Sequence, residues 1–211
     1  MAGGSMTPKE VLRNFAEAGA IITNGHFVYT SGKHGSVYIN KDMLFVDTRR
    51  ISRLCEAMAA NFSHEDIDVV VGPEKGGIIL SQWFAYHYAR YSAGVLAVYA
   101  EKAGNGFIFR RGYGKLITGK RVFVIEDIIT TGESVKSVIE AVHSAGGIVV
   151  GVGALCDRGG ITHETIGTPS LFSLIQLQLD SWDKASCPLC ARGVPINTEV
   201  GKGREYLVKK Q

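Results

Sequence analysis

The sequence has 211 residues, of which 45% are hydrophobic, and 23 basic residues nearly balance 20 acidic ones, giving a net charge of +3. This length suffices for one well-packed core, or one core with a small appendage. The charges are spread along the chain, and no apolar stretch approaches the roughly 20 residues that span a bilayer, so nucleic-acid and membrane partners are not expected. Because no signal peptide is visible, we expect a cytoplasmic protein. Residues 1–5, MAGGS ahead of a second methionine, are expected to be a vector-derived remnant.

The first elements expected along the chain are two helices separated by a segment of different composition. Thr7 and Glu10 form a capping box for a helix that ends near Gly19. Residues 23–42 are rich in Gly, Ser, Tyr and Lys, with alternating apolar residues that are typical of short strands. Residues 47–62 place apolar side chains on one face of a second helix.

Apolar runs then alternate with helical patterns. The runs are "IDVVVG", "VLAVYAEK", "RVFVIED", "IVVGVGAL" and "LFSLIQLQL". Continuous Val and Ile runs joined by helices indicate strands that are buried on both faces. The predicted fold class is therefore α/β, with a mostly parallel twisted sheet flanked by helices.

The stretch "VFVIEDIITTGES", residues 122–134, ends a predicted strand in two adjacent carboxylates, Glu126 and Asp127. Neighbouring acids are poor strand residues and are costly to bury without a partner. They fall at the carboxyl end of a strand, where open α/β sheets bind ligands. The Thr/Gly/Ser turn that follows leads into a helix, whose free N–H groups hold phosphate well. We therefore predict a sugar phosphate ligand; a plain helix cap after an acidic strand end is the alternative.

This stretch resembles the phosphoribosyl-pyrophosphate signature of the type I phosphoribosyltransferases. It differs from a Walker loop, since G-x-x-x-x-G-K-[ST] does not occur, and from a Rossmann fingerprint. The resemblance implies binding of phosphoribosyl pyrophosphate by a continuous run of residues: Glu126, Asp127, Ile128, Ile129, Thr130, Thr131, Gly132, Glu133 and Ser134.

Three further stretches resemble the orotate phosphoribosyltransferases of that family. "VVGPEKGGIIL" resembles their pyrophosphate loop, in which Lys75 adds positive charge beside closely approaching glycines. "FVYTSGKHGSVYINKD" resembles their N-terminal hood and implies Lys33 and Tyr38 as orotate-binding residues. "GALCDRGG" resembles the strand end whose arginine, here Arg158, faces orotate; Thr130 is also expected there. The plainer alternatives are a solvated lysine, a core tyrosine and a surface ion pair.

Together these stretches cover most of the chain. The resemblance extends from about residue 6 to residue 158 and continues into "CPLCARGVPI". It implies one phosphoribosyltransferase domain over residues 6–211, with a small hood formed by about residues 6–42 and the C-terminal segment.

The glycine-rich, basic stretch of residues 103–118 suits a lid that closes over pyrophosphate and excludes water. A surface β-hairpin is the competing interpretation. In the family the lid carries an Arg-Lys pair, a second lysine and a histidine before glycine. This chain keeps Lys102 but has Glu101 in place of the arginine, and it lacks a histidine between residues 88 and 142. Three residues are candidates for the missing charge: Arg110, Arg111 and Lys115.

The resemblance implies transfer of a phosphoribosyl group to orotate, which gives orotidine 5′-monophosphate and pyrophosphate in pyrimidine synthesis. Such a reaction rests on positioning and electrostatics, and Asp127, Glu126 and Lys102 are the expected catalytic residues. Mg²⁺ is the expected cofactor, held mainly by substrate and water rather than by the protein. The resemblance also implies a homodimer whose lid reaches the neighbour's site.

Two alternatives stay open. One is a phosphoribosyltransferase that acts on another base. The other is a catalytically silent regulator that binds phosphoribosyl pyrophosphate, which the lid departures favour slightly. Against a regulator, no winged-helix segment or basic nucleic-acid surface precedes the domain.

In "CPLC", Cys187 and Cys190 have the spacing of a metal or redox pair. A structural zinc needs four ligands, so two more would be required. Cys156 and His163 are conceivable donors, but nothing in the spacing selects them. We favour a turn with two buried thiols and predict no metal held by protein ligands.

Overall fold

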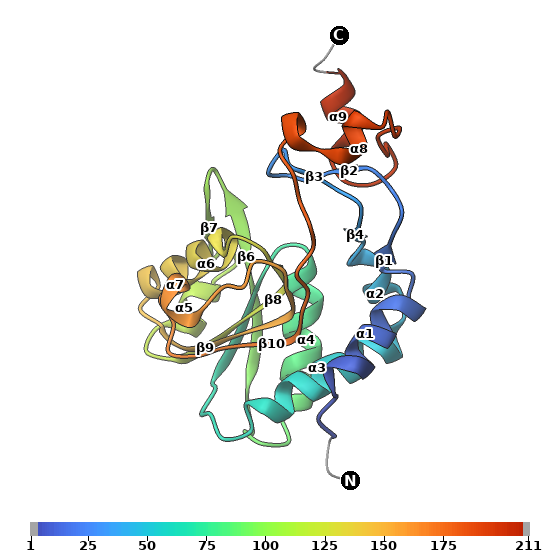
Figure 1. Cartoon of the computed structure of the whole chain (residues 1–211). Helices are drawn as coiled ribbons and strands as arrows, with labels where there is room; N and C mark the ends of the chain where they lie inside the picture. The colour runs from blue at the N-terminus through green and yellow to red at the C-terminus, as the bar shows by residue number, and fades with distance from the viewer. Residues whose placement is uncertain (1–3, 209–211) are drawn as a thin grey trace. The chain divides into compact units, whose positions relative to one another are not determined.

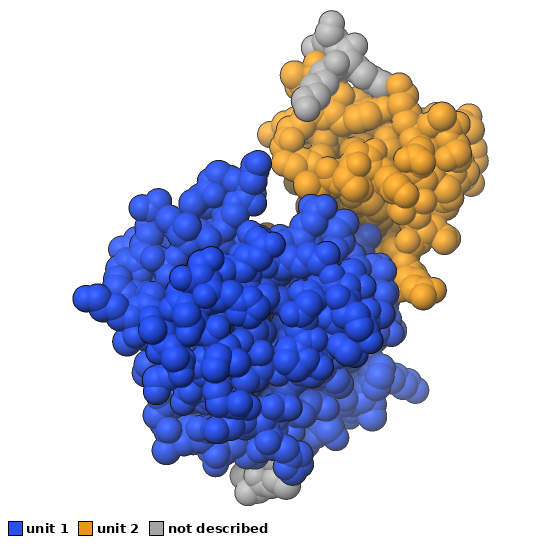
Figure 2. Space-filling view, turned by 90° about the vertical axis from the view of Figure 1, so that its left-hand side faces the viewer, with its two compact units in different colours: residues 1–12, 45–177 blue, residues 13–44, 178–211 orange. Residues whose placement is uncertain are grey.

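The computed structural model describes residues 4–208 of the chain. The chain divides into two compact units, coloured in Figure 2: unit 1 is residues 1–12 and 45–177, and unit 2 is residues 13–44 and 178–211. Helices α1 (Pro8–Glu17) and α2 (Asp42–Val46) each begin in one unit and end in the other. Residues 1–3 of the expected remnant lie outside the described residues.

Unit 1 is built on a six-stranded sheet with the strand order β10-β9-β8-β5-β6-β7. Strand β7 pairs antiparallel with β6, whereas the other neighbours pair in parallel. The strands are β5 (Val69–Pro73), β6 (Leu96–Ala103), β7 (Gly106–Ile108), β8 (Arg121–Ile129), β9 (Ile148–Asp157) and β10 (Leu171–Gln176). The predicted α/β class with a mostly parallel sheet is confirmed.

Helices cover both faces of this sheet, as Figure 1 shows. They are α3 (Thr48–Asn61), α4 (Gly76–Tyr88), α5 (Tyr113–Ile117), α6 (Glu133–Ser144) and α7 (His163–Ile166). On one face, Val69 and Val71 join the apolar side of α6 in one cluster. On the other face, the Phe123 ring stacks on Phe84 at 4.5 Å and meets Phe62 at 4.4 Å. The two-sided burial explains why these strands read as continuous apolar runs.

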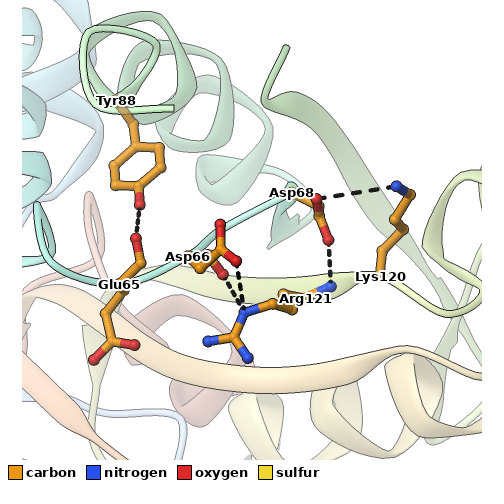
Figure 3. Close-up of polar contacts among 6 residues, drawn as sticks. All are labelled: Glu65, Asp66, Asp68, Tyr88, Lys120 and Arg121. Carbon is orange, nitrogen blue, oxygen red and sulfur yellow. Dashed lines mark hydrogen bonds and ion pairs between the residues drawn. The ribbon is translucent and has the colours of Figure 1, made fainter. Parts of the chain in front are cut away.

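A polar network fixes the amino end of β8 (Figure 3). The backbone N–H of Arg121 donates to Asp68 at 2.9 Å, and its Nε donates to the carbonyl of Asp66 at 2.6 Å. On α4, the fully buried Tyr88 donates its hydroxyl to the carbonyl of Glu65. These contacts anchor the segment that leads into β5, so β5 and β8 start in a fixed register.

Unit 2 is built from short elements. Strand β1 (Ile21–Ile22) pairs antiparallel with β4 (Tyr38–Ile39), and β2 (Phe27–Val28) pairs antiparallel with β3 (His34–Gly35). The C-terminal part contributes the 3₁₀ helix η1 (Lys184–Ser186) and the helices α8 (Pro188–Ala191) and α9 (Gly203–Val208). The short strands predicted for residues 23–42 are therefore confirmed. Backbone hydrogen bonds join the two segments of this unit, as between the Lys202 N–H and the Val28 carbonyl at 2.8 Å.

Helices in the described part of the chain are too short or too polar to cross a bilayer. The predicted first helix is present as α1, and its capping box forms: the Thr7 N–H donates to Glu10 Oε2 at 2.8 Å. The predicted stop at Gly19 is also present, because this glycine has a φ of +69° just beyond the helix.

Candidate functional site

The two acids of the predicted signature lie at the carboxyl end of β8, and both are buried. Glu126 is 7% exposed and Asp127 is 2% exposed. Local hydrogen bonds orient them: the Asp127 N–H donates to Glu126 Oε1 at 2.9 Å, and the Ile128 N–H donates to Asp127 Oδ1 at 2.7 Å. Burial of adjacent carboxylates is costly unless they are bonded. Their position is that of ligand-binding groups in open α/β sheets.

The turn after β8 forms a small pocket. It is lined by Glu126 and by residues 128–135. Gly132 has a φ of +78°, a left-handed conformation that favours glycine, and α6 begins directly after it. The first residues of this 12-residue helix line the same pocket as Thr131, and the leading N–H groups of a helix have no partner within the helix. The turn has the features of a phosphate site.

A second glycine turn, between β5 and α4, contacts the acids. A β-carbon on Gly76 would stand 2.0 Å from Asp127 Oδ2. Gly72 and Gly77 also pack backbone against backbone, since a β-carbon on Gly72 would stand 2.1 Å from the Gly77 carbonyl oxygen. The predicted pyrophosphate loop therefore adjoins Asp127, and its close backbone approach requires glycine.

Lys75 and Lys102 both lie near this turn. Lys75 is exposed immediately before α4, and a non-proline cis peptide bond joins it to Glu74. Glu74 Oε1 accepts a hydrogen bond from the Lys102 backbone N–H at 2.9 Å, which ties the turn to the end of β6. Glu74 is not among the residues predicted from the sequence; its place inside "PEKGG" was the available signal.

The predicted lid segment, residues 103–118, is partly regular. It contains β7, which pairs antiparallel with β6, and the helix α5. The competing β-hairpin interpretation is therefore correct for its first part. At the base of the hairpin, Glu101 accepts from Arg111 Nε at 3.1 Å and pairs with Arg110 Nε at 3.4 Å. The acidic residue at the usual arginine position thus holds two arginines, and both remain more than half exposed.

Arg158 follows β9 beside the phosphate turn. Its backbone N–H donates to the Ile129 carbonyl at 2.8 Å. Gly159, the next residue, packs closely against the phosphate turn, because a β-carbon on it would stand 1.7 Å from the Thr130 carbonyl oxygen. Asp157 closes the loop by accepting from the Gly159 N–H at 2.9 Å. The predicted orotate residues Arg158 and Thr130 therefore lie on adjoining loops of unit 1.

The other two predicted orotate residues belong to unit 2. Lys33 is exposed, and its carbonyl accepts from the Tyr29 N–H at 2.8 Å in the turn between β2 and β3. Tyr38 is half-buried, with its ring centroid 5.5 Å from that of Phe27. Their proposed part in binding orotate stays a prediction.

Comparison with known proteins identifies close relatives. A family model described as a phosphoribosyl transferase domain matches residues 45–183. The orotate phosphoribosyltransferase of Caldanaerobacter subterraneus is 40% identical over 188 residues, covering 89% of this chain and 95% of that protein. That of a Thermoanaerobacter species is 38% identical, covering 90% and 96%. The crystal structure of Mycobacterium tuberculosis orotate phosphoribosyltransferase with Fe(III) dicitrate shares the fold, with a TM-score of 0.64, 24% identity and coverage of 81% of this chain and 97% of that one.

Proposed function

Since the chain belongs to the orotate phosphoribosyltransferases, we propose that it binds phosphoribosyl pyrophosphate at the carboxyl end of β8 and transfers the phosphoribosyl group to orotate. One observation carries the placement. Two buried carboxylates, Glu126 and Asp127, stand between a phosphate-type turn at the start of α6 and a glycine turn at the start of α4. A substrate with phosphate at one end, pyrophosphate at the other and hydroxyls between them matches this order of groups.

The substrate groups can be assigned along the site. The 5′-phosphate lies against residues 130–134, where N–H groups of α6 and small hydroxyls supply donors. The ribose hydroxyls donate to Glu126 and Asp127, since ionised carboxylates act only as acceptors. The pyrophosphate lies along the Gly72–Gly77 turn, with Lys75 and Lys102 as its cations.

The reaction breaks the bond between ribose C1 and a pyrophosphate oxygen. It forms a bond from C1 to a ring nitrogen of orotate, whose proton passes to the released pyrophosphate or to solvent. Positive charge develops on the ribose and negative charge on the leaving group. The carboxylates of Glu126 and Asp127 stabilise the ribose side, and Lys75 and Lys102 stabilise the departing pyrophosphate. No covalent intermediate is required.

The donor chemistry also suits Mg²⁺. Glu126 and Asp127 supply the oxygen atoms that this ion prefers, although it typically keeps several waters and substrate oxygens as ligands. When bound, it would supply positive charge to the pyrophosphate. We propose that the two acids act mainly on the ribose hydroxyls and on waters around the ion.

For orotate, we propose Arg158 and Thr130 as the binding residues of unit 1. The planar guanidinium of Arg158 matches a carboxylate through two parallel donors. That Lys33 and Tyr38 of unit 2 also contact orotate stays a prediction from the sequence resemblance. We also propose a cytoplasmic homodimer whose lid, residues 103–118, reaches the neighbour's site. Analytical ultracentrifugation tests the dimer, and a monomer at assay concentration would contradict it.

Orotate absorbance after addition of phosphoribosyl pyrophosphate tests the function directly. We expect turnover with Mg²⁺, none with a chelator, and a loss of at least about 10²-fold in kcat for Asp127→Asn. The matched control is Asp66→Asn, which changes an acid whose side chain is 81% exposed at the other end of the sheet, and should keep full activity.

Other results would redirect the assignment. Turnover of another base in place of orotate would assign a different phosphoribosyltransferase. Saturable binding of phosphoribosyl pyrophosphate without turnover of any base would assign a regulator.

A further inference from the structure

Unit 2 holds four metal-type side chains in one cluster, all within the described residues. His26, His34, Cys187 and Cys190 each offer one ligand atom, and these four atoms lie within 4.8 Å of one another. His26 is 2% exposed, His34 0% and Cys187 2%, and Cys190 is partly buried. We propose that this cluster is a structural Zn²⁺ site with two nitrogen and two sulfur ligands.

The distances fit a tetrahedral zinc ion. Zn–S bonds of about 2.3 Å and Zn–N bonds of about 2.05 Å place nitrogen and sulfur ligands about 3.6 Å apart. Cys190 Sγ is 3.6 Å from His26 Nε2 and 3.4 Å from His34 Nδ1, and Cys187 Sγ is 3.8 Å from His26 Nε2. The two ring nitrogens are 2.8 Å apart, a hydrogen-bond separation, so they move apart by about 0.5 Å when both bind zinc.

A second set of contacts orients the ligands. His26 Nδ1 lies 2.7 Å from the Val194 carbonyl oxygen. Because a carbonyl oxygen only accepts hydrogen bonds, Nδ1 carries the ring proton and is the donor of this bond. His26 Nε2 is then left with a lone pair that faces the two sulfurs. Metal-binding histidines generally donate their other ring N–H to a carbonyl in this way.

The backbone also prepares the site. The two cysteines lie on a turn closed by the Ala191 N–H to the Cys187 carbonyl at 3.1 Å and the Val194 N–H to the Leu189 carbonyl at 3.0 Å. His34 exchanges two backbone hydrogen bonds with Trp182, each of 2.8 Å. The β2–β3 hairpin and the α8 turn are therefore held together independently of the metal (Figure 1).

The ligand set and its burial select zinc over other ions. Thiolate and imidazole ligands favour Zn²⁺, whereas Mg²⁺ and Ca²⁺ prefer oxygen. Two thiolates, two neutral imidazoles and Zn²⁺ sum to zero charge, which lowers the cost of burying the ion. From the sequence, two buried thiols were favoured at the Cys187–Cys190 turn, because the two histidines could not be identified. The donors that were conceivable for a zinc site, Cys156 and His163, belong to unit 1.

The metal would join segments that are far apart in the sequence, since Cys190 lies 164 residues beyond His26. Unit 2 has two-residue strands and short helices, and small units of this kind gain most from a metal crosslink. The crosslink also fixes the hairpin that carries Lys33. The existence of the site does not depend on the proposed function.

Metal analysis of the full chain, purified without a histidine tag, tests the proposal. We expect one zinc per chain, and an X-ray absorption shell of two sulfurs at about 2.3 Å with two nitrogens at about 2.0 Å. After replacement by Co²⁺, we expect visible bands of tetrahedral cobalt and a thiolate charge-transfer band. These readouts use the unmodified protein, so they hold even where a variant fails to fold.

Variants identify the ligands. His26→Asn and Cys190→Ser should lose the metal and lower the thermal unfolding midpoint, whereas the controls Cys156→Ala and His163→Asn should keep one zinc. Chain that carries far less than one metal and gives no tetrahedral cobalt spectrum overturns the site. Metal retained in both ligand variants, or a shell without sulfur, overturns it equally.

Discussion

A β-carbon on Gly76 would stand 2.0 Å from Asp127 Oδ2, so a carboxylate oxygen at the end of β8 occupies the space that any other residue at position 76 would fill. The two residues come from different strand-to-helix turns. Their contact brings together the proposed ribose and pyrophosphate ends of the site. Because glycine has no side chain, the Asp127 carboxylate can occupy this space.

Gly76→Ala should therefore impair catalysis more than stability. The added methyl displaces Asp127, and a displacement of about 1 Å costs on the order of 10²-fold in rate. Steady-state assays should show a fall of that size in kcat/KM for phosphoribosyl pyrophosphate. Gly4→Ala, where no atom lies within 4 Å of the added carbon and which lies outside the site and the proposed lid, is the control and should have unchanged activity. Equal activity of the two variants would show that the position of Asp127 is unimportant.

Gly132→Ala should weaken binding at the phosphate turn. Its φ of +78° is unfavourable for alanine, and the new β-carbon would lie 2.7 Å from Ile166 Cγ2. We expect a loss of about 1–3 kcal/mol in unfolding free energy and a KM for phosphoribosyl pyrophosphate raised about tenfold.

Gly94→Ala separates the two effects. This residue has a similar φ of +82° and open space around it. The variant should lose stability through backbone strain and keep the wild-type KM. A raised KM in Gly94→Ala, or a normal one in Gly132→Ala, would contradict the role of the turn.

The fold and the phosphate turn were predictable because their signals are local. Continuous Val and Ile runs identify buried strands, and "IITTGES" places the turn between a strand and a helix. The lid was harder to predict, since its glycines suggest a loop. Phe107 in the hairpin strand β7 and Phe109 just beyond it both pack against the core of unit 1, and this period-two spacing was the available signal for the strand.

The metal cluster was not predictable from spacing alone. Cys187 and Cys190 form a recognisable pair, but His26 and His34 lie more than 150 residues away. Backbone contacts between distant segments of unit 2 bring these histidines to the cysteines, such as the bridge of His34 with Trp182 and the bond from the Asn197 N–H to the His26 carbonyl. Such long-range contacts leave no periodic pattern in the sequence.

Tyr88→Phe should lower stability without changing the active site. The Tyr88 hydroxyl is buried and donates to the Glu65 carbonyl, which would lose its partner. We expect a loss of about 1–2 kcal/mol in unfolding free energy, measured by urea denaturation. Tyr86→Phe, on the same helix with a 71% exposed side chain, should be neutral. Equal midpoints for the two variants would show that the buried hydrogen bond contributes nothing.

The same residue predicts a pH dependence. Burial raises the pKa of Tyr88 above its ordinary value of 10.0, so the folded chain keeps the phenol neutral where the unfolded chain ionises. The stability that this provides is complete below about pH 10 and is lost as pH rises toward the folded pKa. Wild-type protein should therefore lose more stability between pH 9 and pH 11 than Tyr88→Phe does. Parallel pH profiles for the two proteins would contradict this.

Two thiols of unit 1 should be inert to alkylation in the native protein. Burial raises the pKa of Cys156 to about 12 and also raises that of Cys55, so at pH 8 almost none of either thiol is the reactive thiolate. Iodoacetamide followed by peptide mass mapping should label both in urea and neither in buffer. Native labelling of Cys156 at the rate of a free cysteine would show that β9 opens readily.

The same labelling experiment distinguishes the cysteines of the two units. Cys187 and Cys190 should be protected while metal is bound and become labelled after chelation. Cys156 and Cys55 should remain unlabelled under both conditions.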